Sequence, residues 1–127
     1  MLEVSDERSV MEATWESSAA KPQLSRAVAR RFFEPKGPMR SHFDNRRSYH
    51  RYYMRGKALL TRGETTLAIY TKDISRQGIC FLSPVQLFPK ECVLMRMPNG
   101  AEYQLQITRC RRDNDQCFEC GTRFALE

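Results

Sequence analysis

From about residue 53 onward, apolar residues recur at every second position, which is the pattern of strands that bury one face. Six short segments show this alternation. Their alternating positions are Met54, Gly56, Ala58 and Leu60; Leu67 and Ile69; Ile79 and Phe81; Cys92 to Met97, which is nearly continuous; Tyr103, Leu105 and Ile107; and Phe118, Cys120, Thr122, Phe124 and Leu126. The pattern therefore predicts six short strands.

Turn signals separate these segments, and no helical pattern lies between them. Asn99-Gly100 is a strong tight-turn signal, and Arg112 to Asp115 forms a second polar turn. Short strands joined by tight turns favour antiparallel pairing, and six of them favour a small barrel over a sandwich. We therefore expect an all-β fold class, a six-stranded antiparallel barrel.

The first third of the chain has a helical pattern instead. Residues 5–18 carry apolar side chains at three- and four-residue spacing, and 25–33 predict a second short helix that ends in a Pro- and Gly-containing linker. We expect residues 1–40 to form an N-terminal helical extension and linker, and residues 41–127 to form the barrel domain. The helices either cover an open end of the barrel, which we favour, or dock a partner protein.

Composition places the chain among small globular proteins. Its 127 residues suit one domain with an appendage, and 41% of them are apolar. No apolar run is long enough for a membrane span, and the acidic N-terminus does not resemble a signal peptide. The five cysteines are odd in number and form no disulfide pattern. We expect a cytoplasmic protein with reduced thiols.

The net charge of +6 is unevenly distributed along the chain. Residues 21–62 carry twelve Lys or Arg against two acidic residues, residues 1–20 are acidic, and residues 63–127 carry eight charges of each sign. Such a basic stretch calls for an anionic partner: nucleic acid, a nucleotide, anionic lipid or the acidic N-terminus of the same chain.

Two short motifs carry the candidate chemistry. The first is NRRSYHRYY, residues 45–53, and the second is DISRQG, residues 73–78, between the second and third predicted strands. Taken alone, the first is typical of a solvated linker and the second of a turn. Together they provide guanidinium groups for phosphate or for the O6/N7 edge of guanine, and a carboxylate acceptor for the opposite guanine edge.

At these motifs the sequence resembles the PilZ domains, receptors for the bacterial second messenger cyclic di-GMP. The match is Arg47-x-x-x-Arg51 followed by Asp73-x-Ser75-x-x-Gly78, and Gly121 with Phe124 stands where the family has its closing Gly-x-x-Phe pattern. The resemblance covers roughly residues 44–126. One departure is that the chain ends directly after the last strand, where family members often continue into a helix.

The resemblance implies a role for each motif residue. Arg47 and Arg51 would come from a flexible tether and wrap the ligand against the barrel, Asp73 and Ser75 would contact guanine, and Gly78 would permit close approach. In the family, an arginine at the position of Arg46 tends to accompany an intercalated ligand dimer. We therefore expect two cyclic di-GMP molecules per domain, with binding that reorients the N-terminal arm and so changes a protein contact.

Other functions find less support in the sequence. Cys117 and Cys120 have the spacing of half a zinc site, but residues three apart in a strand face opposite sides, so we expect no metal. No arrangement of side chains suggests catalysis, so we expect a non-enzymatic protein without a cofactor. Two alternatives remain: a small basic barrel that binds RNA or DNA, which we consider unlikely to be the function, and a degenerate PilZ module that binds only protein.

Overall fold

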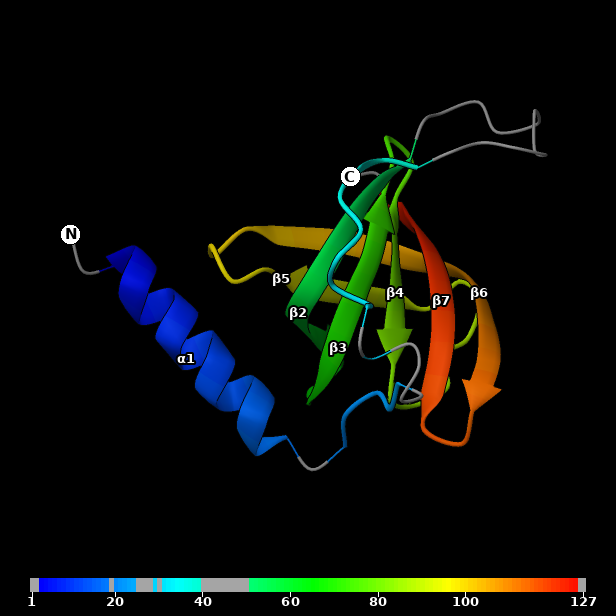
Figure 1. Cartoon of the computed structure of the whole chain (residues 1–127). Coiled ribbons are helices and arrows are strands. Elements are labelled where there is room, and N and C mark those ends of the chain that lie inside the picture. Colours follow the sequence, from blue (N-terminus) through cyan, green and yellow to red (C-terminus); the bar gives the residue numbers. More distant parts are fainter. Residues whose placement is uncertain (1–2, 19, 25–28, 30, 40–50, 126–127) are drawn as a thin grey trace.

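The computed structural model describes residues 3–18, 20–24, 29, 31–39 and 51–125. Within these ranges, one helix and seven strands have bounds that the structure gives, and they follow one another along the chain (Figure 1). They are α1 (Glu3–Ser17), β1 (Gly37–Pro38), β2 (Tyr52–Arg62), β3 (Thr65–Ile74), β4 (Ile79–Ser83), β5 (Cys92–Arg96), β6 (Glu102–Asn114) and β7 (Cys117–Phe124).

Strands β2 to β7 form a closed antiparallel barrel, which confirms the predicted fold class. The strand order is β1-β2-β3-β4-β7-β6-β5, and β2 also pairs with β5, so that the sheet closes on itself. Leu60, for example, pairs with Leu67 of β3 and with Met95 of β5. The two-residue β1, which the sequence did not indicate, pairs with the beginning of β2.

The interior of the barrel contains the apolar positions that the period-two pattern selected. Its fully or nearly buried residues come from all six barrel strands and from Leu87 in the β4–β5 connection. They are Ala58, Leu60, Leu67, Ile69, Ile79, Phe81, Leu87, Val93, Met95, Leu105, Ile107 and Cys120. Burial of these side chains is the main favourable contribution to the barrel's stability.

The two predicted turns differ in outcome. Gly100 adopts a φ of 90° in a tight turn closed by the N–H of Met97 on the carbonyl of Ala101, so the Asn99-Gly100 prediction is confirmed. The second prediction is wrong in its extent, because β6 continues to Asn114 and pairs there with Cys117. The residues beyond Cys110 extend past the core as a polar hairpin, and their polarity made them resemble a turn.

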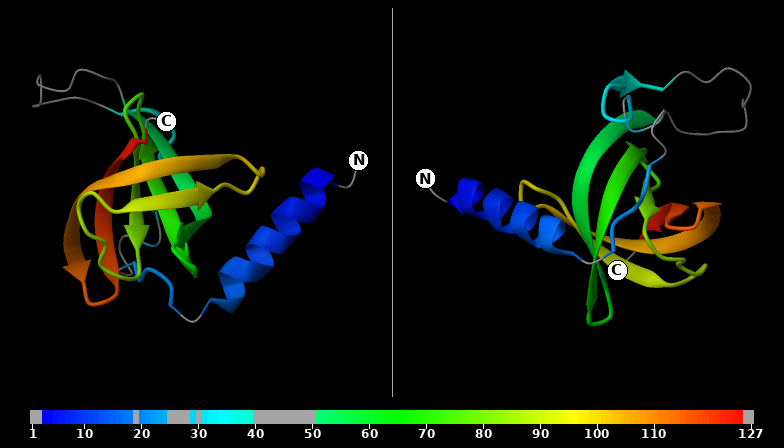
Figure 2. Two further views of the ribbon diagram at one scale, coloured as in Figure 1. Left: turned by 180° about the vertical axis from the view of Figure 1, so that it is seen from behind. Right: turned by 60° about the horizontal axis from the view of Figure 1, so that its bottom comes forward.

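Helix α1 lies against the outward face of β2 and β3 (Figure 2). Met11 and Trp15 pack on Leu59 and Ala68, and the indole N–H of Trp15 donates to the carbonyl of Ile69 at 2.9 Å. The prediction of a helix over residues 5–18 is thus confirmed, and Trp15 attaches the helix to the barrel wall.

The segment after α1 returns along the same wall. Phe32 is buried against Leu82 and Cys117, and the guanidinium of Arg55 lies over its ring at 4.5 Å. The predicted second helix, residues 25–33, falls largely outside the described residues. Within the part of the chain that the structure describes, no helix is both long and apolar enough to cross a membrane.

Candidate functional site

A row of four paired residues crosses the barrel wall from β3 to β6. Asp73 of β3 pairs with Cys80 of β4, Cys80 pairs with Gly121 of β7, and Gly121 pairs with Arg109 of β6. All four line a surface pocket of about 210 Å³, which we call the trough. The charged residues Asp73 and Arg109 form its two rims, and the small residues Cys80 and Gly121 form its floor between them.

Two β-bulges turn the charged rim residues outward. In β3, Thr71 pairs with the core residue Phe81, whereas Asp73 pairs with Cys80, the neighbour on the opposite face. A register shift between Thr71 and Asp73 makes this possible. A bulge adds one residue to a strand and so reverses the side-chain alternation beyond it.

The same device operates in β6. Ile107 is buried in the core and Arg109 is exposed, although residues two apart in a regular strand share a face. The register shifts between them, with Thr108 as the extra residue. Each charged rim of the trough therefore depends on a local break in strand pairing.

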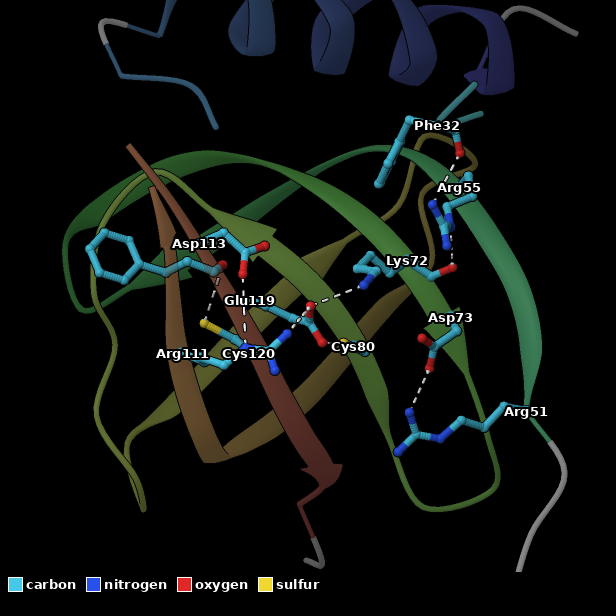
Figure 3. A network of polar contacts seen from close by, with 11 residues as sticks. Phe32, Arg51, Arg55, Lys72, Asp73, Cys80, Arg111, Asp113, Glu119 and Cys120 are labelled. Atoms are coloured by element: carbon cyan, nitrogen blue, oxygen red, sulfur yellow. Dashed lines mark hydrogen bonds and ion pairs between the residues drawn. The ribbon is translucent and has the colours of Figure 1, made fainter. Parts of the chain in front are cut away.

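The guanidinium of Arg51 lies beside the carboxylate of Asp73 at one rim of the trough. Their closest atoms, Nη1 of Arg51 and Oδ1 of Asp73, are 3.6 Å apart, as Figure 3 shows. The Asp73 side chain is only 6% exposed. Burial raises the pKa of Asp73 above the usual carboxyl value, and the positive charges of Arg51, Lys72 and Arg55 oppose that rise.

The turn after β3 is fixed by bonds within itself and to β7. The N–H of Ser75 donates to the carbonyl of Gly78, and the N–H of Gln77 donates to the hydroxyl of Ser75. The N–H of Phe124 in turn donates to the carbonyl of Gln77 at 2.6 Å. Ser75 is thus held at the edge of the trough, where it is one of the lining residues.

Gly78 is required by the approach of β7. A Cβ atom built on Gly78 would overlap the carbonyl group of Thr122 and would lie 2.7 Å from Cα of Arg123. The φ of Gly78 is not positive, unlike that of Gly63 in the β2–β3 turn. This strand contact is a reason for glycine that the sequence did not reveal, and it is independent of any ligand.

Of the six predicted site residues, the structure describes four. Arg51, Asp73, Ser75 and Gly78 come from two separate motifs and line the same trough. Arg46 and Arg47 lie outside the described residues.

Sequence reasoning missed two further arginines of the trough, Arg109 and Arg123. Arg123 falls within the closing Gly-x-x-Phe pattern, which is a signal that could have found it. Arg109 carried no such signal, because only the pairing of β6 with β7 brings it to the trough.

A partly buried ion-pair network borders the trough on β3 and β7. Lys72 donates to Glu119 at 3.0 Å, and Arg111 reaches the same carboxylate at 3.3 Å (Figure 3). Burial alone would raise the pKa of Glu119, but the hydrogen bond from Lys72 and the nearby positive charges outweigh it and lower that pKa. Glu119 is therefore occupied by Lys72 of β3 and Arg111 of β6.

Three of the five cysteines, Cys80, Cys117 and Cys120, are buried, whereas Cys92 is exposed and Cys110 is intermediate. Cys120 points into the core while Cys117 packs outside the barrel against Phe32 and Leu82, which confirms that they face opposite sides. Burial raises the pKa of Cys80 to about 12 and that of Cys117 to about 11. Among the described residues, no cluster of His, Cys, Asp and Glu could hold a metal ion.

Comparison with known families agrees with the barrel fold. The family model of the PilZ domain matches residues 45–127, and the chain belongs to the PilZ family. This family consists of cyclic di-GMP-binding effector domains that are generally binding modules rather than enzymes. No curated protein matched the chain.

Proposed function

We propose that this protein is a non-enzymatic receptor for cyclic di-GMP and that the trough is its binding site. Asp73 accepts hydrogen bonds from guanine, Ser75 contributes a hydroxyl, and Gly78 allows the backbone to approach. Arg46, Arg47 and Arg51 bind phosphate oxygens or the other guanine edge. Family membership supports the ligand, because binding of cyclic di-GMP is the common property of PilZ domains.

The observation that carries the proposal is the meeting of Arg51 and Asp73. Arg51 directly precedes β2 and Asp73 lies near the end of β3, yet their charged groups lie 3.6 Å apart at the rim of one open pocket. A fork of N–H donors next to a carboxylate acceptor matches a guanine base and an adjacent phosphate. The distance is long for a tight ion pair, so the ligand can insert between the two groups at little cost.

The proposed stoichiometry is two cyclic di-GMP molecules per chain. Arg46 precedes the motif arginines directly, and a guanidinium there can stack on a second base and offset the added phosphate charge. Calorimetric stoichiometry tests this part separately, because a value of one ligand per chain would overturn the dimer and leave the receptor intact.

The proposed response is a reorientation of the N-terminal arm. The N–H of Met39 donates to the carbonyl of Arg51 at 2.8 Å, and β1 pairs with the first residues of β2. Movement of Arg51 onto a ligand would therefore pull on the segment that leads back to α1. Binding of this kind orders a hinge through charge-assisted bonds.

The single tryptophan of the chain reports on this movement. Trp15 of α1 packs against β3, where its ring centroid is 5.1 Å from that of Tyr70. Displacement of α1 would transfer the indole to water, so we expect its emission to shift to longer wavelength as cyclic di-GMP is added. Unchanged emission at saturation would contradict the reorientation without affecting the binding proposal.

Calorimetric titration with cyclic di-GMP tests the binding function. We expect Arg51→Ala to weaken affinity by at least about tenfold, since hydrogen bonds to charged groups contribute ~1.5–3 kcal/mol. Arg96→Ala is the matched control, because Arg96 pairs with Glu102 outside the trough. A parental affinity for Arg51→Ala would refute the assignment. Salt-dependent binding of oligonucleotides that is indifferent to Asp73→Ala would instead favour a nucleic-acid function.

A further inference from the structure

Arg109 has no part in the two motifs, yet it forms the rim of the trough opposite Asp73. It is exposed at the β6 bulge, and its side chain lies over the backbone of Gly121. Within the described part of the chain, no hydrogen bond or ion pair holds its guanidinium. The positive charge of Arg109 contributes to the lowered pKa of Glu119, but the bonds to that carboxylate come from Lys72 and Arg111.

We propose that Arg109 is a further ligand-binding residue, which binds a phosphate group of cyclic di-GMP at the β6 side of the trough. This inference rests on the proposed function and extends it to a strand outside both motifs. A guanidinium that makes no hydrogen bond or ion pair with the described residues, next to an open pocket, is suited to bidentate binding of phosphate oxygens.

The dimensions of the row fit this role. Neighbouring strands lie about 4.8 Å apart, so three steps from Asp73 to Arg109 span roughly 14 Å along the trough. A guanine held at Asp73 therefore leaves the sugar–phosphate part of the ligand above Cys80 and Gly121. The small floor residues leave room for it, and Arg109 is the cation at the far end.

Gly121 sets the position of the Arg109 side chain. A Cβ atom at Gly121 would lie 2.7 Å from Nε and 3.1 Å from Cγ of Arg109, so any other residue displaces that side chain. The φ of Gly121 is not positive, which means that the backbone itself tolerates a side chain. Gly121→Ala thus moves the guanidinium while the charge of the protein remains unchanged.

Arg123 strengthens the positive potential at this end of the trough but has a different status. Its Nε–H donates to the side-chain oxygen of Gln106 at 2.8 Å, so part of its donor capacity is occupied. The donors of Arg109, by contrast, make no hydrogen bond with any residue that the structure describes. This difference makes Arg109 rather than Arg123 the residue whose removal we expect to weaken binding most.

The test is calorimetric titration of the full chain and four variants with cyclic di-GMP. We expect Arg109→Ala to weaken binding by about tenfold or more, because it removes a hydrogen bond to a charged group. Arg109→Lys should bind with intermediate affinity, and Gly121→Ala should bind more weakly than the parent. Arg112→Ala is the matched control, because it removes the same charge from the same strand at the hairpin, where Arg112 pairs with Asp115.

The outcomes separate this inference from the function on which it rests. If the parent binds and Arg109→Ala binds equally well, or if Arg112→Ala loses as much affinity, Arg109 has no specific role and the receptor function stands. If the parent does not bind cyclic di-GMP at all, the proposed function fails first and this inference fails with it. Melting temperatures of the variants exclude a folding defect, which we do not expect for the exposed Arg109.

Discussion

At the scale of single residues, Asp73 combines an unfavourable environment with the most specific chemistry of the site. Its carboxylate is almost fully buried, and burial disfavours the charged form. Arg51 at the trough, together with Lys72 and Arg55, partly offsets this cost. The ionised carboxylate is the form that accepts hydrogen bonds from guanine, so a ligand would provide the partners that the free protein supplies only in part.

This conflict predicts an unusual pH dependence of binding. Because the pKa of Asp73 is raised, the carboxylate becomes protonated at a higher pH than an ordinary aspartate when the solution is acidified. Affinity for cyclic di-GMP should therefore fall as pH decreases through that raised pKa, and should be constant above it. Titrations at a series of pH values check this, and Asp73→Asn should bind weakly with no such slope.

The same shift affects the stability of the ligand-free protein. At pH values between the pKa of Asp73 in the unfolded chain and its raised pKa in the folded protein, the folded state holds more protons than the unfolded state. The stability of the fold therefore decreases as the pH rises through that window. The ionised carboxylate of Asp73 therefore destabilises the folded protein at neutral pH. We expect Asp73→Asn to melt at the same or a higher temperature than the parent at pH 7, and a markedly lower melting temperature would contradict this interpretation.

Gly78 gives a residue-scale prediction about folding. A methyl group there would overlap the backbone of Thr122, so β4 and β7 would have to separate where Ile79 and Thr122 exchange two hydrogen bonds. We expect Gly78→Ala to cost more than about 4 kcal/mol, measured by denaturant unfolding. Gly56→Ala is the control, because a Cβ atom there would meet only Oγ1 of Thr71, at 4.0 Å. This substitution should lower the free energy of unfolding by less than about 1 kcal/mol.

At the scale of elements, α1 depends on the barrel for its stability. An isolated helix of 15 residues is marginal in water. Among its residues 10–17, whose side chains the structure describes, Met11 and Trp15 are buried against the barrel. Lys57 on β2 adds an exposed ion pair with Glu16 and lies 4.6 Å from the ring centroid of Trp15. Among the described side chains of the helix, Trp15 therefore makes the contact whose removal we expect to matter most.

Trp15→Ala should release α1 from the wall. The lost burial amounts to about 3–5 kcal/mol, which exceeds what a surface helix of this length can sustain. Hydrogen exchange followed by mass spectrometry should then show fast exchange for the amides of residues 3–17 and unchanged exchange in the barrel. Val10→Ala, at a position 63% exposed, should leave the helix protected. Protection that survives Trp15→Ala would show that other contacts hold the helix.

The strands themselves were predictable because burial inside a barrel imposes a period of two. The position of α1 was less accessible, although Leu59 between Ala58 and Leu60 is a signal that an outward face is also covered. The bulges were not predictable. Strict alternation would place Arg109 on the buried face with Ile107, and only the register shift between them brings the arginine to the surface.

At the scale of the whole molecule, the barrel uses its outer wall in two ways. One part is covered, by α1 on β2 and β3 and by Phe32 on β3, β4 and β7, and another part from β3 to β6 carries the trough. The trough combines β3, β4, β7 and β6, and β4 and β7 are distant in sequence. The two motifs and their order were visible in the sequence, whereas the rim opposite them exists only after the barrel has closed.

The central claim is that Arg51 and Asp73 act on one ligand, and a double-variant titration with cyclic di-GMP tests it most directly. Calorimetry on the parent, Arg51→Ala, Asp73→Asn and the combined variant should show two ligands per parent chain and a loss of affinity in each single variant. The combined variant should lose measurably less than the two single losses together, because Arg51 and Asp73 lie in contact and would form one network with the ligand. Absence of binding by the parent, or single variants with the parental affinity, would contradict the account.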